Sequence, residues 1–185
     1  QMRETVSLED LEGWRVGSQD HSRSGAMKLS AVNRCVECLT DSMAKLPSFI
    51  MKEADKQRLP EHPLVELLER RPNEAMAPAV YKKLMETTRL LTGNAYALIL
   101  RASHSARPAE LLPLPAQLVQ LAFDDGGRLW YICTNPRTGE RRRVSQFDLL
   151  HYKAFSQDGV TGISVLSRAA EVVSTGRALQ QYEGR

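Results

Sequence analysis

The 185-residue sequence lacks any apolar run close to the ~20 residues that a membrane-spanning helix needs, and its first residues lack the pattern of a secretory signal peptide. It has little excess charge: the formal net charge is only +3, which by itself does not indicate a nucleic-acid partner. Cysteine is scarce as well, and three cysteines at irregular spacing favour a reducing compartment over a disulfide framework. With 42% hydrophobic and 25% charged residues, the composition is ordinary for a soluble globular protein.

Motifs for catalysis and cofactor binding are missing too. Gly159 and Gly162 stand too close together for a nucleotide-binding loop, and no lysine follows them. The four histidines are scattered and none accompanies a nucleophile motif, although His151 could make a structural hydrogen bond. Asp124 and Asp125 lie in a predicted turn. We therefore expect no catalytic residue, no cofactor and no metal site, and a protein that is not an enzyme.

One pair of cysteines has the spacing of redox and zinc sites. Cys35 and Cys38 are separated by two residues, but they lie about two turns inside a predicted helix rather than at its first turn, where the helix dipole would activate a thiol. A zinc site would need two more ligands, and the remaining cysteine and histidines offer no pair at a matching spacing. We interpret the two cysteines as small side chains that pack beside the apolar face of the helix.

The chain divides into three predicted segments. Residues 1–25 are polar, with glycine and serine towards their end, which predicts a flexible arm; Trp14 within it needs a docking site, on the same chain or on a neighbouring subunit. We expect one α+β domain over residues 26–163 and the start of a longer helix over residues 164–185. Because the sequence begins at Gln1 and stops within a helical pattern, we also expect a fragment or a processed product.

The clearest periodic pattern starts at residue 29. From there apolar side chains recur at intervals of three and four residues, which predicts a helix of about five turns with one buried apolar face, ended by Pro47. A short strand is predicted at 48–52, and further helices at 62–70 and 78–92, the last ending at the glycine that follows it. The apolar face of the first helix consists of Leu29, Val32, Val36, Leu39, Met43 and Leu46.

Beyond residue 93 the sequence turns to short strands. Residues 94–100 are apolar enough for a central strand, whereas Pro113 and Pro115 restrict the next strand to a sheet edge. Ser164 is a suitable N-cap for the last helix. Helices first and strands second predict an α+β fold in which helices pack on a small, mostly antiparallel meandering sheet. The other predicted strands are 118–123, 128–133 and 140–144, and residues 147–151 are predicted to form one more short strand or a turn.

The densest basic cluster is formed by three consecutive arginines, Arg141, Arg142 and Arg143. On a strand, Arg141 and Arg143 point to the same side, where guanidinium groups could pair with phosphate oxygens of a DNA backbone or with carboxylates of a neighbouring subunit. No aromatic residues are interleaved with the cluster, so stacking on single-stranded nucleic acid is not supported.

Five segments, in order, resemble the head portal protein family of tailed bacteriophages, in the branch typical of long-tailed phages. No single motif is specific, but the ordered series covers residues 26–170. One departure is Val165, where the family usually has proline after the serine. The first 25 residues match nothing. The segments are AVNRCVECLTDSMAKLPSFIMK (31–52), HPLVELLERRPN (62–73), LLTGNAYALILR (90–101), LLPLPAQLV (111–119) and FDLLHYKAFSQDGVTGISVLSRA (147–169).

The resemblance implies a structural ring subunit, twelve copies to a ring, at the unique vertex of the viral capsid. Double-stranded phage DNA is packaged and ejected through such a ring, which also contacts terminase, capsid and tail-connector proteins. Residues 26–163 would form a wing-like domain and 164–185 the start of the stem helix, with clip, tunnel loop and crown absent. The location implied is the virion, after assembly in the bacterial cytoplasm, with no cofactor and no membrane. The alternative is a basic nucleic-acid-binding adaptor that is not a portal protein.

Overall fold

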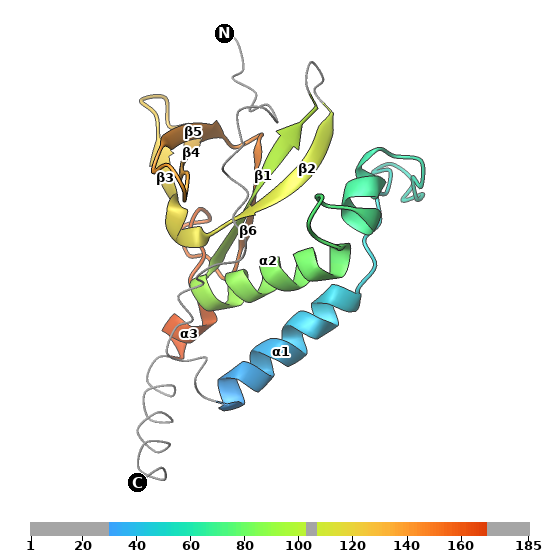
Figure 1. Cartoon of the computed structure of the whole chain (residues 1–185), viewed down its shortest axis with the longest axis horizontal. Coiled ribbons are helices and arrows are strands. Elements are labelled where there is room, and N and C mark those ends of the chain that lie inside the picture. Colours follow the sequence, from blue (N-terminus) through green and yellow to red (C-terminus); the bar gives the residue numbers. More distant parts are fainter. Residues whose placement is uncertain (1–29, 103–106, 170–185) are drawn as a thin grey trace.

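The structure, a computed structural model, describes residues 30–102 and 107–169, which form helices and two small sheets (Figure 1). The predicted arm at 1–25 and most of the predicted last helix lie outside these described residues. In chain order the elements are helix α1 (Ser30–Lys45), the π-helical segment η3 (Glu66–Arg70), helix α2 (Pro78–Thr92), strands β1 (Asn94–Arg101) and β2 (Pro108–Leu114), the 3-10 turn η4 (Ala116–Leu118), strands β3 (Val119–Phe123), β4 (Leu129–Thr134), β5 (Arg141–Ser145) and β6 (Leu149–Lys153), and the short helix α3 (Val165–Arg168).

The strands are arranged in two three-stranded antiparallel sheets, ordered β2-β1-β6 and β3-β4-β5. This confirms the predicted α+β class, but the chain builds two sheets rather than one meander. The 3-10 turn η4, with Pro115 at its N-cap, lies between β2 of one sheet and β3 of the other. β1 is central and β2 is an edge strand, as the prolines predicted.

The alternation of side chains along β1 builds a three-layer core. Ala95 and Ala97 face α2 and pack with Tyr81 and Met85 in one cluster. Their neighbours Tyr96, Leu98 and Leu100 point the other way, into a second cluster that also contains buried residues of the β3-β4-β5 sheet. Because successive strand residues point to opposite faces, β1 supplies small side chains to the helix layer and large ones to the second sheet. α1 packs outside α2 (Figure 1).

The segment between η3 and α2 closes the outer edge of β2. Leu111 donates its backbone N–H to the Pro72 carbonyl at 2.7 Å, and its own carbonyl accepts a hydrogen bond from Asn73 Nδ2 at 2.9 Å. Asn73 Oδ1 also accepts from the N–H of Ala75 at 3.0 Å. Both polar backbone groups of Leu111 are therefore satisfied at an edge where proline residues weaken strand pairing.

Several local predictions need correction. Residues 48–52 form no strand; Met51 only makes an isolated bridge with Arg58, across a turn in which Lys56 has φ 57. The helix predicted at 62–70 is largely π-helical, and the strand predicted at 147–151 is β6, two residues further on.

Only part of the apolar face predicted for α1, which includes Val36, packs in this chain. Thr40 and Val36 are the buried residues of this helix. Leu39, Met43 and Leu46 of the predicted face are exposed, because the helix is rotated so that its more polar side contacts α2.

Two glycines hold the end of α2 against the loop that leads to α3. Gly93 ends α2 with φ 86, and a Cβ on it would lie 2.4 Å from the Gly162 carbonyl oxygen. A Cβ on Gly162 would lie 2.0 Å from the Gly93 oxygen, which itself accepts a hydrogen bond from Ala154 at 2.8 Å. The two backbones therefore approach more closely than any side chain would allow.

Replacing Gly93 by alanine tests this contact. We expect Gly93→Ala to lower the free energy of unfolding by about 3 kcal/mol, since it combines a left-handed backbone with a steric overlap. Gly159→Ala is the matched control, because Gly159 has φ 73 but a Cβ there would meet no atom within 4 Å; it should cost only about 1–2 kcal/mol. Equal losses in chemical denaturation of the two variants would contradict the proposed overlap.

Candidate functional site

The structure brings together two sequence motifs that lie almost 70 residues apart, Gly93-Asn94 and the Gly159–Ser164 loop. Asn94 Nδ2 donates to the Gly162 carbonyl at 2.9 Å, and the Gly162 N–H donates to Asn94 Oδ1 at 2.8 Å. Ser164 caps α3, its Oγ accepting from the Ser167 N–H at 2.9 Å. Val165, which departs from the expected proline, begins the helix without disturbing this cap. The junction fixes the direction in which the chain enters α3.

His151 extends this junction into the second sheet. Its Nε2 lies 2.9 Å from Asn94 Oδ1 and its Nδ1 lies 3.2 Å from the Tyr131 hydroxyl. The ring also packs on Tyr96, with centroids 4.4 Å apart. Since an amide oxygen can only accept, Nε2 carries the proton and Nδ1 accepts from the tyrosine. Burial, with a smaller contribution from the charge of Lys153, lowers the pKa of His151 to about 4. The imidazole is therefore neutral and engaged at both nitrogens, the structural role that the sequence suggested.

The three arginines lie on β5, an outer strand of the β3-β4-β5 sheet. Arg141 and Arg143 are exposed, in agreement with the strand alternation predicted for them. Arg141 donates to Gln120 Oε1 on β3, and Arg142 pairs with Glu140 at 2.9 Å. The exposed guanidinium groups of Arg141 and Arg143 thus lie on one side of β5, and we call them the arginine row.

An aromatic ring accompanies this row, which the sequence did not reveal. The Arg143 guanidinium lies 4.0 Å from the ring centroid of Trp130, and its Nη2 lies 3.9 Å from Asp124 Oδ2. Trp130 Nε1 in turn donates to Asp124 Oδ2 at 3.2 Å. Trp130 belongs to the neighbouring strand β4, so only the strand register brings it to Arg143. Asp124 accepts a backbone hydrogen bond from Arg128 as well, which is the main cause that lowers its pKa to about 2.

The cysteine pair does not pack in the core as expected. Cys35 and Cys38 are both exposed on α1, whereas Cys133 is buried in β4, where burial raises its thiol pKa to about 12. Among the described residues, no group of three or more His, Cys, Asp or Glu side chains is arranged to hold a metal ion. The interpretation of Cys35 and Cys38 as packed small side chains is therefore wrong, since both lie on an exposed part of the surface of α1.

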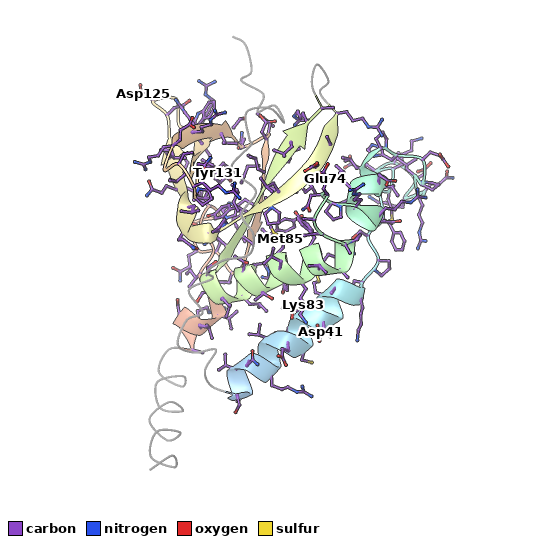
Figure 2. All side chains as sticks on the ribbon, in the orientation of Figure 1. Asp41, Glu74, Lys83, Met85, Asp125 and Tyr131 are labelled. Atoms are coloured by element: carbon purple, nitrogen blue, oxygen red, sulfur yellow. The ribbon has the colours of Figure 1, made fainter. Side chains whose placement is uncertain are left out.

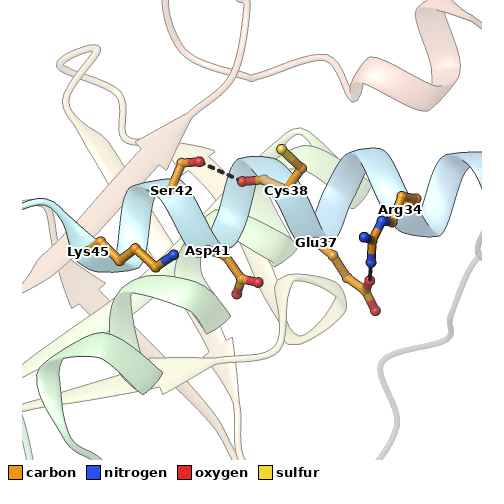
Figure 3. A pocket seen from close by; sticks show the side chains of 6 residues that line it. All are labelled: Arg34, Glu37, Cys38, Asp41, Ser42 and Lys45. Carbon is orange, nitrogen blue, oxygen red and sulfur yellow. Dashed lines mark hydrogen bonds and ion pairs between the residues drawn. The ribbon is translucent and has the colours of Figure 1, made fainter.

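A shallow groove of about 280 Å³ runs along the polar side of α1 (Figure 3). Asp41 accepts a hydrogen bond from Lys83 Nζ on α2, and this contact lowers the pKa of Asp41. Glu37 Oε2 lies 3.8 Å from Arg34 Nη1. These ion pairs follow the helix surface and bring no nucleophile and base onto a common target. In the part of the chain that the structure describes, no helix is long and apolar enough to cross a membrane. The lining residues are Arg34, Glu37, Cys38, Asp41, Ser42 and Lys45.

The neutral His151 predicts a pH dependence of stability. Its folded pKa is lowered, so between pH 6.5 and about 4 the unfolded chain binds the proton more readily than the folded chain. The stabilisation from His151 is therefore present above pH 6.5 and is lost as the pH falls towards 4. We expect the urea midpoint of the wild type to fall across this window and that of His151→Gln to change less. An identical slope in both proteins would contradict a role for His151.

Comparisons with known proteins agree with this architecture. A sequence profile described as phage portal protein matches residues 30–185. The chain is 27% identical to the portal protein of Enterobacteria phage HK97 over 161 residues, covering 85% of this chain and 37% of that protein. It is 32% identical to Protein BeeE of Escherichia coli (strain K12) over 139 residues, covering 74% of this chain and 80% of BeeE.

Solved structures share the fold. A chain from the neck of an empty GTA particle computed with C6 symmetry superposes with a TM-score of 0.71 at 21% identity, over 90% of this chain and 46% of that chain. An HK97 family phage portal protein from Corynebacterium diphtheriae gives a TM-score of 0.60 at 17% identity, over 88% of this chain and 49% of that chain. The chain thus spans less than half of several relatives that it matches. Its match over residues 30–185 shows that it belongs to the phage portal protein family.

Proposed function

We propose that this chain is part of a portal subunit, a structural component of the ring at the unique capsid vertex through which double-stranded DNA is packaged and ejected. The observation that carries the proposal is the family match over residues 30–185, supported by the shared α+β fold. In this role the subunit meets DNA, terminase, capsid and tail-connector proteins. The virion is its final location, after assembly in the bacterial cytoplasm.

Ring formation is the part of this proposal that can be tested on the chain itself. One structural relative is described as the neck of a native GTA particle computed with C12 symmetry, and another as the virion of a native gene transfer agent particle. Twelve copies to a ring is the arrangement we propose for the portal subunit. A closed ring requires each copy to present one surface to the next copy and a different surface to the previous one.

The geometry of the junction supports a structural rather than a catalytic role. Asn94, His151 and Gly162 bond to one another, and both His151 nitrogens are occupied within the chain. We propose that residues 26–163 form the wing-like domain and that α3 opens the helix towards the stem. The Asn94–Gly162 bonds and the Ser164 cap would then set the angle between wing and stem.

The ordered arginines of β5 are proposed as a contact with a neighbouring subunit, with the DNA backbone as the other candidate. Arg141 and Arg143 are exposed on the same side of an outer strand. The Trp130 ring and the Asp124 carboxylate hold Arg143 in place, which reduces the entropy lost when its planar guanidinium pairs with a carboxylate or a phosphate.

Native mass spectrometry of the purified chain tests ring formation. We expect a denatured mass near 20.8 kDa and native species at high multiples, ideally twelve, because ring closure removes all unpaired ends. A chain that stays monomeric at every concentration, and that binds double-stranded DNA in a salt-sensitive way, would instead favour a nucleic-acid-binding adaptor.

Charge reversal tests the arginine row. The double variant Arg141→Glu/Arg143→Glu should lower the population of high multiples several-fold, because it places like charges against the neighbouring subunit. Arg137→Glu, in the exposed turn before β5, is the control for reversal of a single arginine; it should assemble normally, whereas Arg141→Glu and Arg143→Glu should each impair assembly. Unchanged assembly of the double variant together with weaker DNA binding would assign the row to the DNA backbone instead.

A further inference from the structure

Three large apolar side chains at the C-terminal half of α1 are exposed. Leu39, Met43 and Leu46 are 54%, 45% and 56% exposed, and their spacing places them on one side of the helix and of the residue that follows it. We call these three residues the α1 stripe. Large apolar side chains at this spacing normally mark the buried side of a helix. An exposed apolar surface of this kind is typical of a docking site.

Helix α2 packs beside the α1 stripe rather than over it. Val36 and Thr40 are the buried residues of α1, which packs on α2. Asp41 of α1 accepts a hydrogen bond from Lys83 Nζ of α2, and Figure 2 shows the two side chains meeting between the helices. At about 100° per residue, Asp41 lies roughly half a turn from Leu39. The α1 stripe therefore lies on the flank of the helix that α2 leaves open.

The segment that leads into α1 brings apolar side chains of its own. The largest of them is the indole of Trp14, which stands in an otherwise polar part of the sequence. A tryptophan ring offers about 150–250 Å² of surface whose burial is favourable. Residues 17–25 then have the glycine- and serine-rich composition of a linker. We call residues 6–16 the N-terminal segment; its apolar residues are Val6, Leu8, Leu11, Trp14 and Val16.

The length of the linker matches the position of the α1 stripe. Ser30, the first residue of α1, follows Trp14 by 16 residues, and a chain of that length and composition has a root-mean-square span of about 20–24 Å. With a rise of about 1.5 Å per residue, Leu39 and Met43 lie about 14 Å and about 20 Å along the helix from Ser30. The effective concentration of a tethered group is highest where its reach matches the span. Trp14 is therefore concentrated at the α1 stripe of its own chain.

Charge supports the same placement. When Trp14 lies on the α1 stripe, the residues before it extend past the C-terminal end of α1, and three of them, Glu9, Asp10 and Glu12, are acidic. Residues 45–58, which they meet there, carry an excess of basic side chains. Such opposite charges orient a docked segment more than they tighten it. The basic residues are Lys45, Lys52, Lys56 and Arg58, and the acidic ones are Glu53 and Asp55.

We propose that the N-terminal segment covers the α1 stripe of its own chain, with Trp14 seated against Leu39 and Met43. The tether favours this occupant over a second copy or another protein, since it holds the indole within reach at any protein concentration. The contact assigns the docking site that Trp14 needs to the same chain. It places α1 between α2 and the N-terminal segment, and it does not depend on the portal function.

The two exposed cysteines of α1 report this contact in the full chain. Cys35 precedes Leu39 by one helical turn and lies beside the α1 stripe, whereas Cys38 lines the groove on the other side. We expect maleimide to label Cys35 about tenfold or more slowly than Cys38, because labelling of Cys35 requires the N-terminal segment to detach. Tandem mass spectrometry locates the label on either cysteine. The rates are measured in samples diluted until they no longer change.

Single substitutions on both sides of the contact test its partners. Trp14→Ser and Met43→Ser should each abolish the slow labelling of Cys35, since each removes one side of the contact. Phe123→Ser is the matched control for Met43→Ser, because Phe123 is a large apolar residue, 59% exposed, at the end of β3. His21→Ser, in the linker, is the control for Trp14→Ser. Both controls should keep the slow labelling, and far-ultraviolet circular dichroism verifies that each variant is folded.

Three outcomes would overturn the inference. The first is equal labelling of the two cysteines in the wild type. The second is slow labelling of Cys35 that persists in Trp14→Ser, which would assign the cover to another segment, such as residues 170–185. The third is slow labelling that disappears on dilution, which would assign it to a neighbouring copy. Ring formation is measured separately by native mass spectrometry, so the loss of this contact leaves the portal proposal standing.

Discussion

The fold depends on the contact between Gly93 and Gly162, where two backbones meet without room for a side chain. Gly93 ends α2 and leads directly into β1, and Gly162 lies just before α3, so one contact fixes where a helix ends, where the central strand begins and where the last helix starts. β1 contributes to both core clusters. A shift at this contact would therefore move both layers that pack on β1.

The polar network around Asn94 extends this constraint across the molecule. Asn94 binds Gly162 on one side and His151 on the other, and His151 reaches Tyr131 in the second sheet. Such a network is stable only when all its members are satisfied, and a charged imidazole would lose the hydrogen bond that its Nδ1 accepts. The lowered pKa of His151 keeps the ring neutral and the network complete. These polar residues therefore link β1, β4, β6 and the loop before α3.

Local signals in the sequence predicted the elements well, and long-range geometry poorly. Pro78 and Gly93 mark the ends of α2, and Pro113 and Pro115 place β2 at an edge, because each acts through its own backbone. The Trp130–Arg143 contact depends on strand register, and the division into two sheets depends on how the strands pair. Register and pairing involve several segments at once, so no single segment of the sequence predicts them. The Gly-Asn-Ala-Tyr segment carries part of the family resemblance, but only the three-dimensional structure shows that Gly162 is its partner.

The exposed apolar residues of α1 show that a periodic sequence pattern predicts a helix but does not identify what its apolar face contacts. Periodicity predicted the helix, since apolar residues at intervals of three and four need a common environment, but it also predicted that Leu39, Met43 and Leu46 would contact this chain. Selection acts on the assembled, functional state of a protein. An apolar periodicity in the sequence can therefore reflect burial in an interface between chains as well as burial in the core of one chain. When an amphipathic helix packs through Val36 and Thr40 and leaves its leucines exposed, the simplest physical account is that something other than the described residues covers the apolar face.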